Sequence, residues 1–300
     1  FLEALYFESH NDVGGRPVYL GSDREFRTRN HQLLRSFKDG PALSSGLILA
    51  GVLLALSMQL SLYLLTEIRL ADSITLALLL VGMPVLAIAQ IPLIQEALLE
   101  RLPAYWSSIG TLCALAVIIC LVGMRSEGPV AIGLQWISLG NLVAWGLALT
   151  IAGLAVSFAF RGVGASLGLK ESRVLRALLP ETAKERGVFA LLSVAAGFGE
   201  EVAYRGYAIP VLTPITGVGG AVLITSLVFG GMHAYQGLLG IIRTMTMGVI
   251  LAGGFLVSGS VLPCILAHTL IDIIAGIAIG QHLMLPEESI SVEDVTWPEP

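Results

Sequence analysis

The chain has 300 residues, of which 55% are hydrophobic and only 13% are charged, and its formal net charge is −5. Soluble domains carry about 25% charged residues, so this composition excludes an ordinary soluble protein. The apolar residues form continuous runs long enough to span a bilayer, not the alternating pattern of a membrane β-barrel. The sequence therefore predicts an all-α polytopic membrane protein of about eight transmembrane helices in a lipid bilayer. No basic cluster indicates a nucleic-acid partner.

The first half of the chain predicts a polar arm followed by four apolar spans. Residues 1–43 contain six arginines and lysines and are interpreted as a cytoplasmic arm with a surface helix near residues 30–38. The four spans are expected at residues 44–66, 73–95, 106–124 and 135–160, and Pro84 and Pro92 are expected to kink the second. None of these four ranges contains a charged residue or a histidine. Residues 44–160 are therefore predicted to form a lipid-packed scaffold.

A basic hydrophilic segment, residues 161–186, follows the scaffold. It carries six arginines and lysines, whereas the loops between the first four spans hold one arginine each. The positive-inside rule places both this loop and the N-terminal arm in the cytoplasm. Residues 174–179 are predicted to form a surface helix that ends at Pro180. Thr182, with Glu185 three residues on, is predicted to begin the next helix with a capping box.

From residue 187 the apolar runs contain ionisable residues. Four further helices are expected at 187–210, 218–235, 238–257 and 261–279, so residues 187–280 form the predicted functional core, followed by an acidic tail at 281–300. Ionisable side chains at membrane depth cost several kcal/mol and by default indicate a functional site. They are Glu200, Glu201, Arg205, His233, Arg243, His268 and Asp272.

The spacing of these residues predicts how they are arranged. Residues four apart share one face of a helix, so Glu201 can pair with Arg205, whereas Glu200 has no basic partner four residues on. The same spacing relates Glu200 to Tyr204, Phe229 to His233, and His268 to Asp272.

Three helices can therefore direct Glu200, His233, His268 and Asp272 into one cavity. Tyr204 and Phe229 are interpreted as walls of this cavity, and Arg243 as a structural or interfacial residue. The set contains no serine or cysteine beside a base, so a hydrolase built on it would use water as its nucleophile.

Three segments of this core resemble the motifs of a known protease family. They are Glu-Glu-Val-Ala-Tyr-Arg at 200–205, Phe-Gly-Gly-Met-His at 229–233 and His-Thr-Leu-Ile-Asp at 268–272. They are similar to the EExxxR, FxxxH and HxxxN motifs of the CAAX prenyl protease and bacteriocin-processing family, also called CPBP or Abi. That family includes the Ras-converting endopeptidases. The resemblance covers about residues 179–279, and the first four spans carry no motif.

The resemblance implies an intramembrane glutamic endopeptidase with eight helices, a cavity open to the cytoplasm and no cofactor. By analogy Glu200 activates a water with help from His233, while His268 and Asp272 occupy the oxyanion-stabilising positions. Glu201 and Arg205 orient the helix that carries the base. The implied substrate is a peptide or membrane protein, and the implied location is a bacterial cytoplasmic membrane.

One position departs from the family pattern, because the last motif ends in Asp272 instead of asparagine. An asparagine amide can donate a hydrogen bond to an oxyanion, whereas an ionised carboxylate only accepts. Asp272 therefore either orients His268, holds it protonated or carries a proton itself.

Three other functions are compatible with the same residues. Two histidines and a carboxylate also match a catalytic zinc set, although no HExxH motif occurs. A non-catalytic immunity-type or scaffold protein would keep the fold and bind a peptide or partner. Intramembrane Glu, His and Asp also serve as proton relays in transporters, but no internal repeat supports that function. The sequence indicates no oligomeric state.

Overall fold

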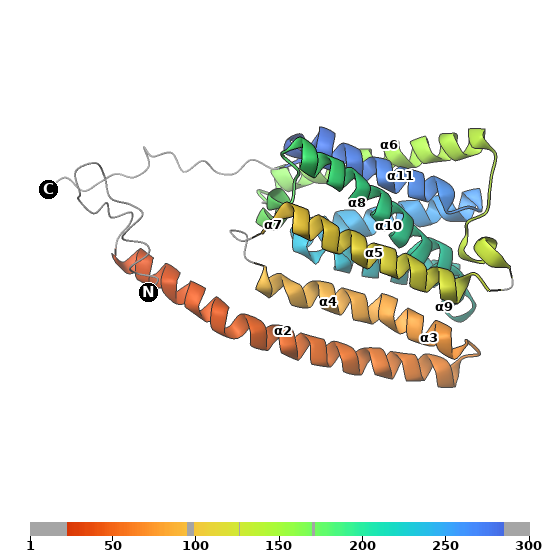
Figure 1. Ribbon diagram of the computed structural model, residues 1–300, viewed down its shortest axis with the longest axis horizontal. Coiled ribbons are helices and arrows are strands. Elements are labelled where there is room, and N and C mark those ends of the chain that lie inside the picture. Colours follow the sequence, from red (N-terminus) through yellow and green to blue (C-terminus); the bar gives the residue numbers. More distant parts are fainter. Residues whose placement is uncertain (1–22, 95–98, 126, 170–171, 285–300) are drawn as a thin grey trace.

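The computed structural model describes residues 23–94, 99–125, 127–169 and 172–284, with side chains from residue 43 onward except residue 281. Within these ranges the chain forms a bundle of helices without any strand (Figure 1). The predicted all-α fold class is confirmed.

The first four apolar runs fold as helices close to their predicted positions. In chain order the elements are α2 (Asp23–Leu65), α3 (Leu70–Ala77), the π-helical η1 (Leu78–Gly82), α4 (Met83–Gln90), the 3₁₀-helical η2 (Ile91–Leu93), α5 (Arg101–Gly123), the 3₁₀-helical η4 (Gly128–Ile132) and α6 (Leu139–Ser166). The surface helix expected near residues 30–38 is not a separate element. It is part of α2, which continues without a break into the first span.

The prediction that this half contains no charged residue within its spans is wrong. The second span begins at Leu70, not at residue 73, and so includes Asp72, which is 3% exposed. Asp72 accepts hydrogen bonds from two residues far away in the sequence, Arg125 and Tyr207. Because these partners satisfy its charge, the helix tolerates a carboxylate that its local sequence marks as a loop residue.

The second half contains the long helices of the predicted core. Its elements are α7 (Arg173–Ala177), α8 (Ala183–Glu201), the π-helical η5 (Val202–Ala208), α9 (Ile209–Met232), the 3₁₀-helical η6 (Ala234–Gln236), α10 (Gly237–Ser258), α11 (Leu262–Ile273), the π-helical η7 (Ile274–Ala278) and α12 (Gly280–Leu283). The predicted capping box is present: the backbone N–H of Glu185 donates to Thr182 Oγ1 (3.2 Å), and that of Thr182 to Glu185 Oε2 (2.9 Å).

The helix that carries the first motif is predicted to end at Pro210, but in the structure it continues to Gly217. Gly217 has φ 71° and ψ 165°, a conformation that side chains essentially forbid, and it separates α9 into two parts. The π-helical η5 ends at Ala208, just before Pro210. A proline ring in an α-helix clashes with a carbonyl of the preceding turn, and the wider π-helical turn relieves this clash, so Pro210 is tolerated. The π-helical η1 stands in the same relation to Pro84.

Six helical segments of the described residues are long and apolar enough to cross a membrane. One of them, Ala183–Met232, consists of the two helices that meet at Gly217, and the shorter apolar helix Leu262–Ala278 adds a further candidate. When the two parts of Ala183–Met232 and the helix Leu262–Ala278 are each counted as a span, the total agrees with the eight helices expected from the sequence.

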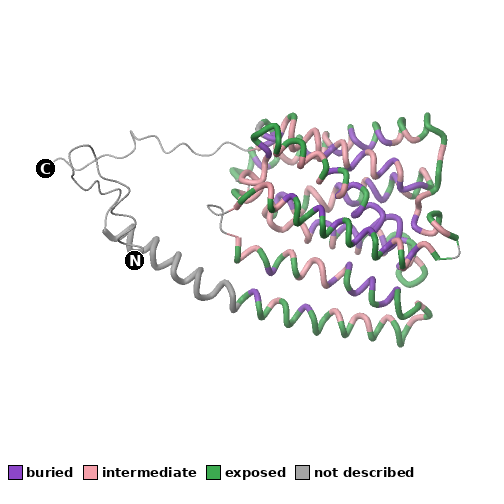
Figure 2. The backbone as a smooth tube through the Cα atoms, viewed as in Figure 1, coloured by how far each residue is buried: buried purple, intermediate pink, exposed green. Residues whose placement is uncertain are grey.

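Large apolar side chains lie on the outside of this bundle. Leu53 of α2 is 60% exposed and Leu121 of α5 is 80% exposed, and Figure 2 shows the exposed class along the outer helices. A soluble protein rarely exposes such continuous apolar surface. The protein is therefore an integral membrane protein whose outer helices face lipid.

The most buried part of the bundle is the π-helical segment η5. Each of its residues, Val202–Ala208, is buried, and α8 before it packs between α5 and α11. Both carboxylates of the first motif lie directly before η5, at the end of α8. The predicted site is thus in the densest part of the molecule.

Candidate active site

The first motif forms a fully buried ion pair at the junction of α8 and η5. Arg205 Nη1 donates to Glu201 Oε1 at 2.7 Å, and both side chains are at most 2% exposed. Arg205 Nη2 also donates to the backbone oxygen of Gly248 on α10 (3.2 Å), and its Cζ lies 4.5 Å from the centre of the Phe229 ring. The guanidinium therefore joins three helices, and a cation over an aromatic face is itself attractive.

Glu201 has a second contact that the sequence did not predict. His268 Nδ1–H donates to the same oxygen, Glu201 Oε1, at 2.8 Å. The two residues are 67 positions apart, so no local spacing indicates the contact. Glu201 thus fixes the His268 ring, and a hydrogen bond at one imidazole nitrogen determines how the other nitrogen is presented.

The other nitrogen of His268 faces two carboxylates. Its Nε2 lies 3.8 Å from Glu200 Oε2 and 3.6 Å from Asp272 Oδ2. Three of the four predicted catalytic residues therefore meet around one imidazole. His268 and Glu200 are both 8% exposed, whereas the Asp272 side chain is 37% exposed and faces a more open region.

His233, the fourth predicted catalytic residue, lies at the end of α9. Its Nδ1–H donates to the backbone oxygen of Phe229 at 2.8 Å, which leaves Nε2 with a lone pair in the neutral ring. Its ring centre is 5.1 Å from that of Phe229, and the Phe229 ring centre is 6.0 Å from that of His268.

Tyr204 and Phe229, interpreted from the sequence as walls of a cavity, are packed against this group. Their rings meet edge to face with centres 5.7 Å apart, and both side chains are nearly inaccessible. The Tyr204 hydroxyl lies 2.6 Å from Met232 Sδ and 3.4 Å from the backbone oxygen of Leu79 in η1. The wall thus reaches into the second span.

Glu200 and Glu201 share one feature and differ in another. Oε2 of each carboxylate is buried without a hydrogen-bond partner among the described residues, but only Glu201 is held through its other oxygen, by Arg205 and His268. Buried polar atoms are nearly always hydrogen-bonded, so such an atom needs an explanation. A carboxylate oxygen in this state can accept a hydrogen bond from a water molecule or a substrate.

A second polar group adjoins the site and includes Arg243, which the sequence indicated as structural or interfacial. Arg243 Nη2 donates to Gln236 Oε1 (2.9 Å), and Gln236 Nε2 donates to the Tyr235 hydroxyl (3.1 Å). The Tyr235 ring lies 6.0 Å from that of His233, and Ser172 Oγ donates to the Tyr235 backbone oxygen (2.6 Å). The basic segment 161–186 therefore contacts the edge of the site.

Among the described residues no group of three or more His, Cys, Asp or Glu side chains is placed to hold a metal ion.

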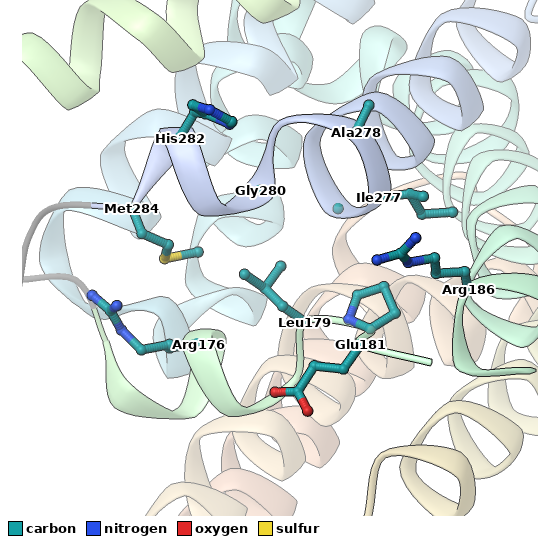
Figure 3. A pocket seen from close by; sticks show the side chains of 11 residues that line it. Arg176, Leu179, Glu181, Arg186, Ile277, Ala278, Gly280, His282 and Met284 are labelled. Carbon is teal, nitrogen blue, oxygen red and sulfur yellow. The ribbon is translucent and has the colours of Figure 1, made fainter. Parts of the chain in front are cut away.

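A large cavity lies at the end of the bundle near α7 (Figure 3), with a volume of about 610 Å³. Arg176 and Arg186 enter it from opposite sides, and Gly276, Ile277 and His282 belong to its lining. Glu200, His233, His268 and Asp272 are not among its lining residues. This cavity is separate from the motif residues.

Residues 183–274 match the family model of type II CAAX prenyl endopeptidase Rce1-like proteins. This part of the chain is similar to that family. The match confirms the resemblance read from the three motifs, all of which lie inside it, and the family is one of membrane proteases. No curated protein and no solved structure matches the chain.

Proposed function

We propose that this protein is an intramembrane endopeptidase in which Glu200 activates a water molecule to hydrolyse a peptide bond. One observation carries the proposal. Glu200 Oε2 is buried without a hydrogen-bond partner among the described residues, and it lies 3.8 Å from His268 Nε2. A water can therefore be held between a base and a second polar group.

In the attack step the carboxylate of Glu200 accepts a proton from this water. The water oxygen bonds to the carbonyl carbon of the substrate, and the carbonyl π electrons move onto its oxygen. His233 supports the step, because its Nδ1–H is held by the Phe229 backbone and its Nε2 can accept a hydrogen bond from the water. A positioned general base contributes about 10²–10⁴-fold to such a reaction.

The oxyanion formed in this step requires a hydrogen-bond donor. His268 Nε2 can supply one when it carries a proton, since Nδ1 is already engaged with Glu201. Asp272 faces the same nitrogen and orients it. The intermediate then collapses: the C–N bond breaks, and the proton held by Glu200 passes to the leaving nitrogen, which regenerates the carboxylate.

The remaining parts of the proposal concern the setting. The reaction needs no metal ion, the substrate is a peptide or membrane protein, and the site opens toward the cytoplasm of a bacterial cell. The family match supports a protease of the membrane, and the contact of Ser172 with Tyr235 beside the site supports access from the side of segment 161–186.

The test is cleavage of a peptide library by the purified protein, compared with the Glu200→Gln and Glu100→Gln variants. Glu100 is exposed and lies outside the three motifs, so its variant serves as the matched control. We expect a 10²–10⁴-fold slower rate for Glu200→Gln only, a general-base effect of roughly that size. Full activity of Glu200→Gln would overturn the proposal. If the purified protein contains stoichiometric zinc, and a chelator removes this zinc and the cleavage activity together, the metal-free mechanism is overturned.

A further inference from the structure

The first four spans contribute a buried polar cluster that touches the motif helix. Asp72 of α3 is 3% exposed, and its Oδ1 accepts hydrogen bonds from the Tyr207 hydroxyl (2.7 Å) and from Arg125 Nη2. Tyr207 is 135 residues away from Asp72 and itself only 2% exposed. The matched family segment begins at residue 183, so Asp72 and Arg125 lie outside it.

Tyr207 belongs to the same π-helical segment, η5, that carries Arg205. A π-helix is rare, and its wide turns persist only where the surroundings hold them. Side-chain contacts hold η5 at three residues: Tyr204 reaches Leu79, Arg205 reaches Glu201, and Tyr207 reaches Asp72. The Asp72 contact is the one nearest to the C-terminal end of η5.

Close packing leaves little room for η5 to move in other ways. A Cβ on Gly206, next to Tyr207, would lie 2.1 Å from the backbone oxygen of Ile132, so η4 and η5 meet at backbone distance. A Cβ on Gly123 would lie 3.2 Å from the Tyr207 ring. The ring is therefore enclosed, and its hydroxyl hydrogen bond fixes its rotation.

The charge of Asp72 is balanced independently of Tyr207. The Arg125 side chain is 30% exposed and borders a cavity of about 480 Å³, which also touches Tyr207 and Pro210. Removing the Tyr207 hydroxyl would therefore leave the Asp72–Arg125 pair intact. Removing the charge of Asp72 would disturb Arg125 but leave an oxygen to accept from Tyr207.

We propose that Asp72 and Tyr207 are positioning residues: their hydrogen bond holds η5 in its π-helical register and thereby places Glu200, Glu201 and Arg205 for reaction. This inference rests on the proposed function. It assigns a part in catalysis to the spans that carry no motif. Placement matters because a misplacement of about 1 Å can cost roughly 10²-fold in rate.

Two substitutions separate positioning from folding. Tyr207→Phe removes the hydrogen bond and keeps the ion pair, so we expect kcat to fall by about tenfold or more, with KM and thermal stability little changed. Asp72→Asn keeps an acceptor for Tyr207 and removes the charge opposite Arg125. We expect it to lower the melting temperature while kcat, corrected for the folded fraction, stays within about threefold.

The control is Tyr105→Phe, which removes another buried hydroxyl, bonded to the Leu178 backbone oxygen (2.5 Å) and far from η5 in the sequence. Equal kcat values for the two Tyr→Phe variants would overturn the proposal. The proposal would also be overturned if Asp72→Asn lowered kcat as much as Tyr207→Phe does and this loss of kcat paralleled the loss of thermal stability.

Hydrogen–deuterium exchange keeps this test separate from that of the proposed function. We expect Tyr207→Phe, but not Tyr105→Phe, to raise exchange in peptides that cover residues 198–212. If the wild-type protein cleaves no peptide, the proposed function fails, and unchanged exchange in Tyr207→Phe would then refute the positioning role as well.

Discussion

At the scale of single residues, two neighbouring carboxylates have different surroundings. Oε1 of Glu201 accepts hydrogen bonds from both Arg205 and His268, whereas Glu200 Oε2 has no hydrogen-bond partner among the described residues and faces His268 Nε2 at 3.8 Å. A carboxylate held by two donors suits a structural and orienting part. A carboxylate that no donor holds suits proton transfer. Adjacent residues on a helix point about 100° apart, which is enough to separate these surroundings.

Glu201→Gln is expected to destabilise the protein. The substitution removes the charge that balances Arg205 and that fixes His268 in the centre of the bundle. Removal of one partner from a buried ion pair costs about 3–5 kcal/mol. The melting temperature in detergent should fall well below that of Glu200→Gln. A Glu201→Gln protein that melts with the wild type would contradict the assignment.

Asp272→Asn tests the departure from the family motif. Asp272 Oδ2 lies 3.6 Å from His268 Nε2, so the substitution removes a negative charge beside the imidazole. If Asp272 acts by orienting or charging His268, activity should fall about tenfold, or ~1.4 kcal/mol, at every pH tested. Activity that is preserved and less dependent on pH would instead show that Asp272 donates a hydrogen bond while protonated. Rates measured at several pH values distinguish the two.

The sequence was a good guide to contacts within a helix and a poor one to contacts between helices. Four-residue spacing predicted the Glu201–Arg205 pair, because the geometry of one helix determines it. The Glu201–His268 and Asp72–Tyr207 hydrogen bonds depend on how distant helices pack. Asp72 in particular lies outside the predicted spans, since nothing nearby in the sequence indicates its partners.

At the scale of elements, two π-helical segments each end shortly before a proline, η1 before Pro84 and η5 before Pro210. The sequence predicted a kink for the first proline and a helix end for the second. The rules that a proline kinks or ends a helix do not anticipate a widened π-helical turn that lets the helix continue past the proline. The helix positions were otherwise close to those observed, because long apolar runs with polar ends determine them.

Gly206→Ala is expected to disrupt the contact between η4 and η5. The added Cβ would lie 2.1 Å from the Ile132 backbone oxygen, and backbone cannot withdraw as a flexible side chain can. Overpacking of this kind costs about 1–3 kcal/mol. Gly110→Ala is the control, since its Cβ would meet nothing within 4 Å and alanine favours a helix. Thermal melts should show a loss for Gly206→Ala only, and equal melts would contradict the packing argument.

At the scale of the whole molecule, helix direction alternates through the bundle. The described start of α2, the short helix α7 and the end of α11 all lie toward the same end (Figure 1). This arrangement agrees with the even number of spans inferred between the N-terminal arm and the basic segment. The side of the membrane on which this end lies follows from the arginine and lysine bias.

We predict that residues 1–43, the segment 161–186 and the tail 281–300 all lie in the cytoplasm. Single cysteines introduced at Arg173 and, as a control for the opposite side, at Glu127 should label differently in intact cells. An impermeant thiol reagent should modify the Glu127 position only. Modification of the Arg173 position from outside would reverse the topology.

The uninterrupted helix from Ala183 to Thr216 has a consequence for the surrounding lipid. At 1.5 Å per residue it is roughly 50 Å long, whereas the hydrocarbon layer is about 30 Å thick. Such a helix must tilt strongly, project from the layer or thin the bilayer around it. Because Glu200 lies near its middle, bilayer thickness sets the depth at which the proposed general base lies. If the proposed function holds, acyl-chain length thus becomes a determinant of which peptide bonds this protein can reach.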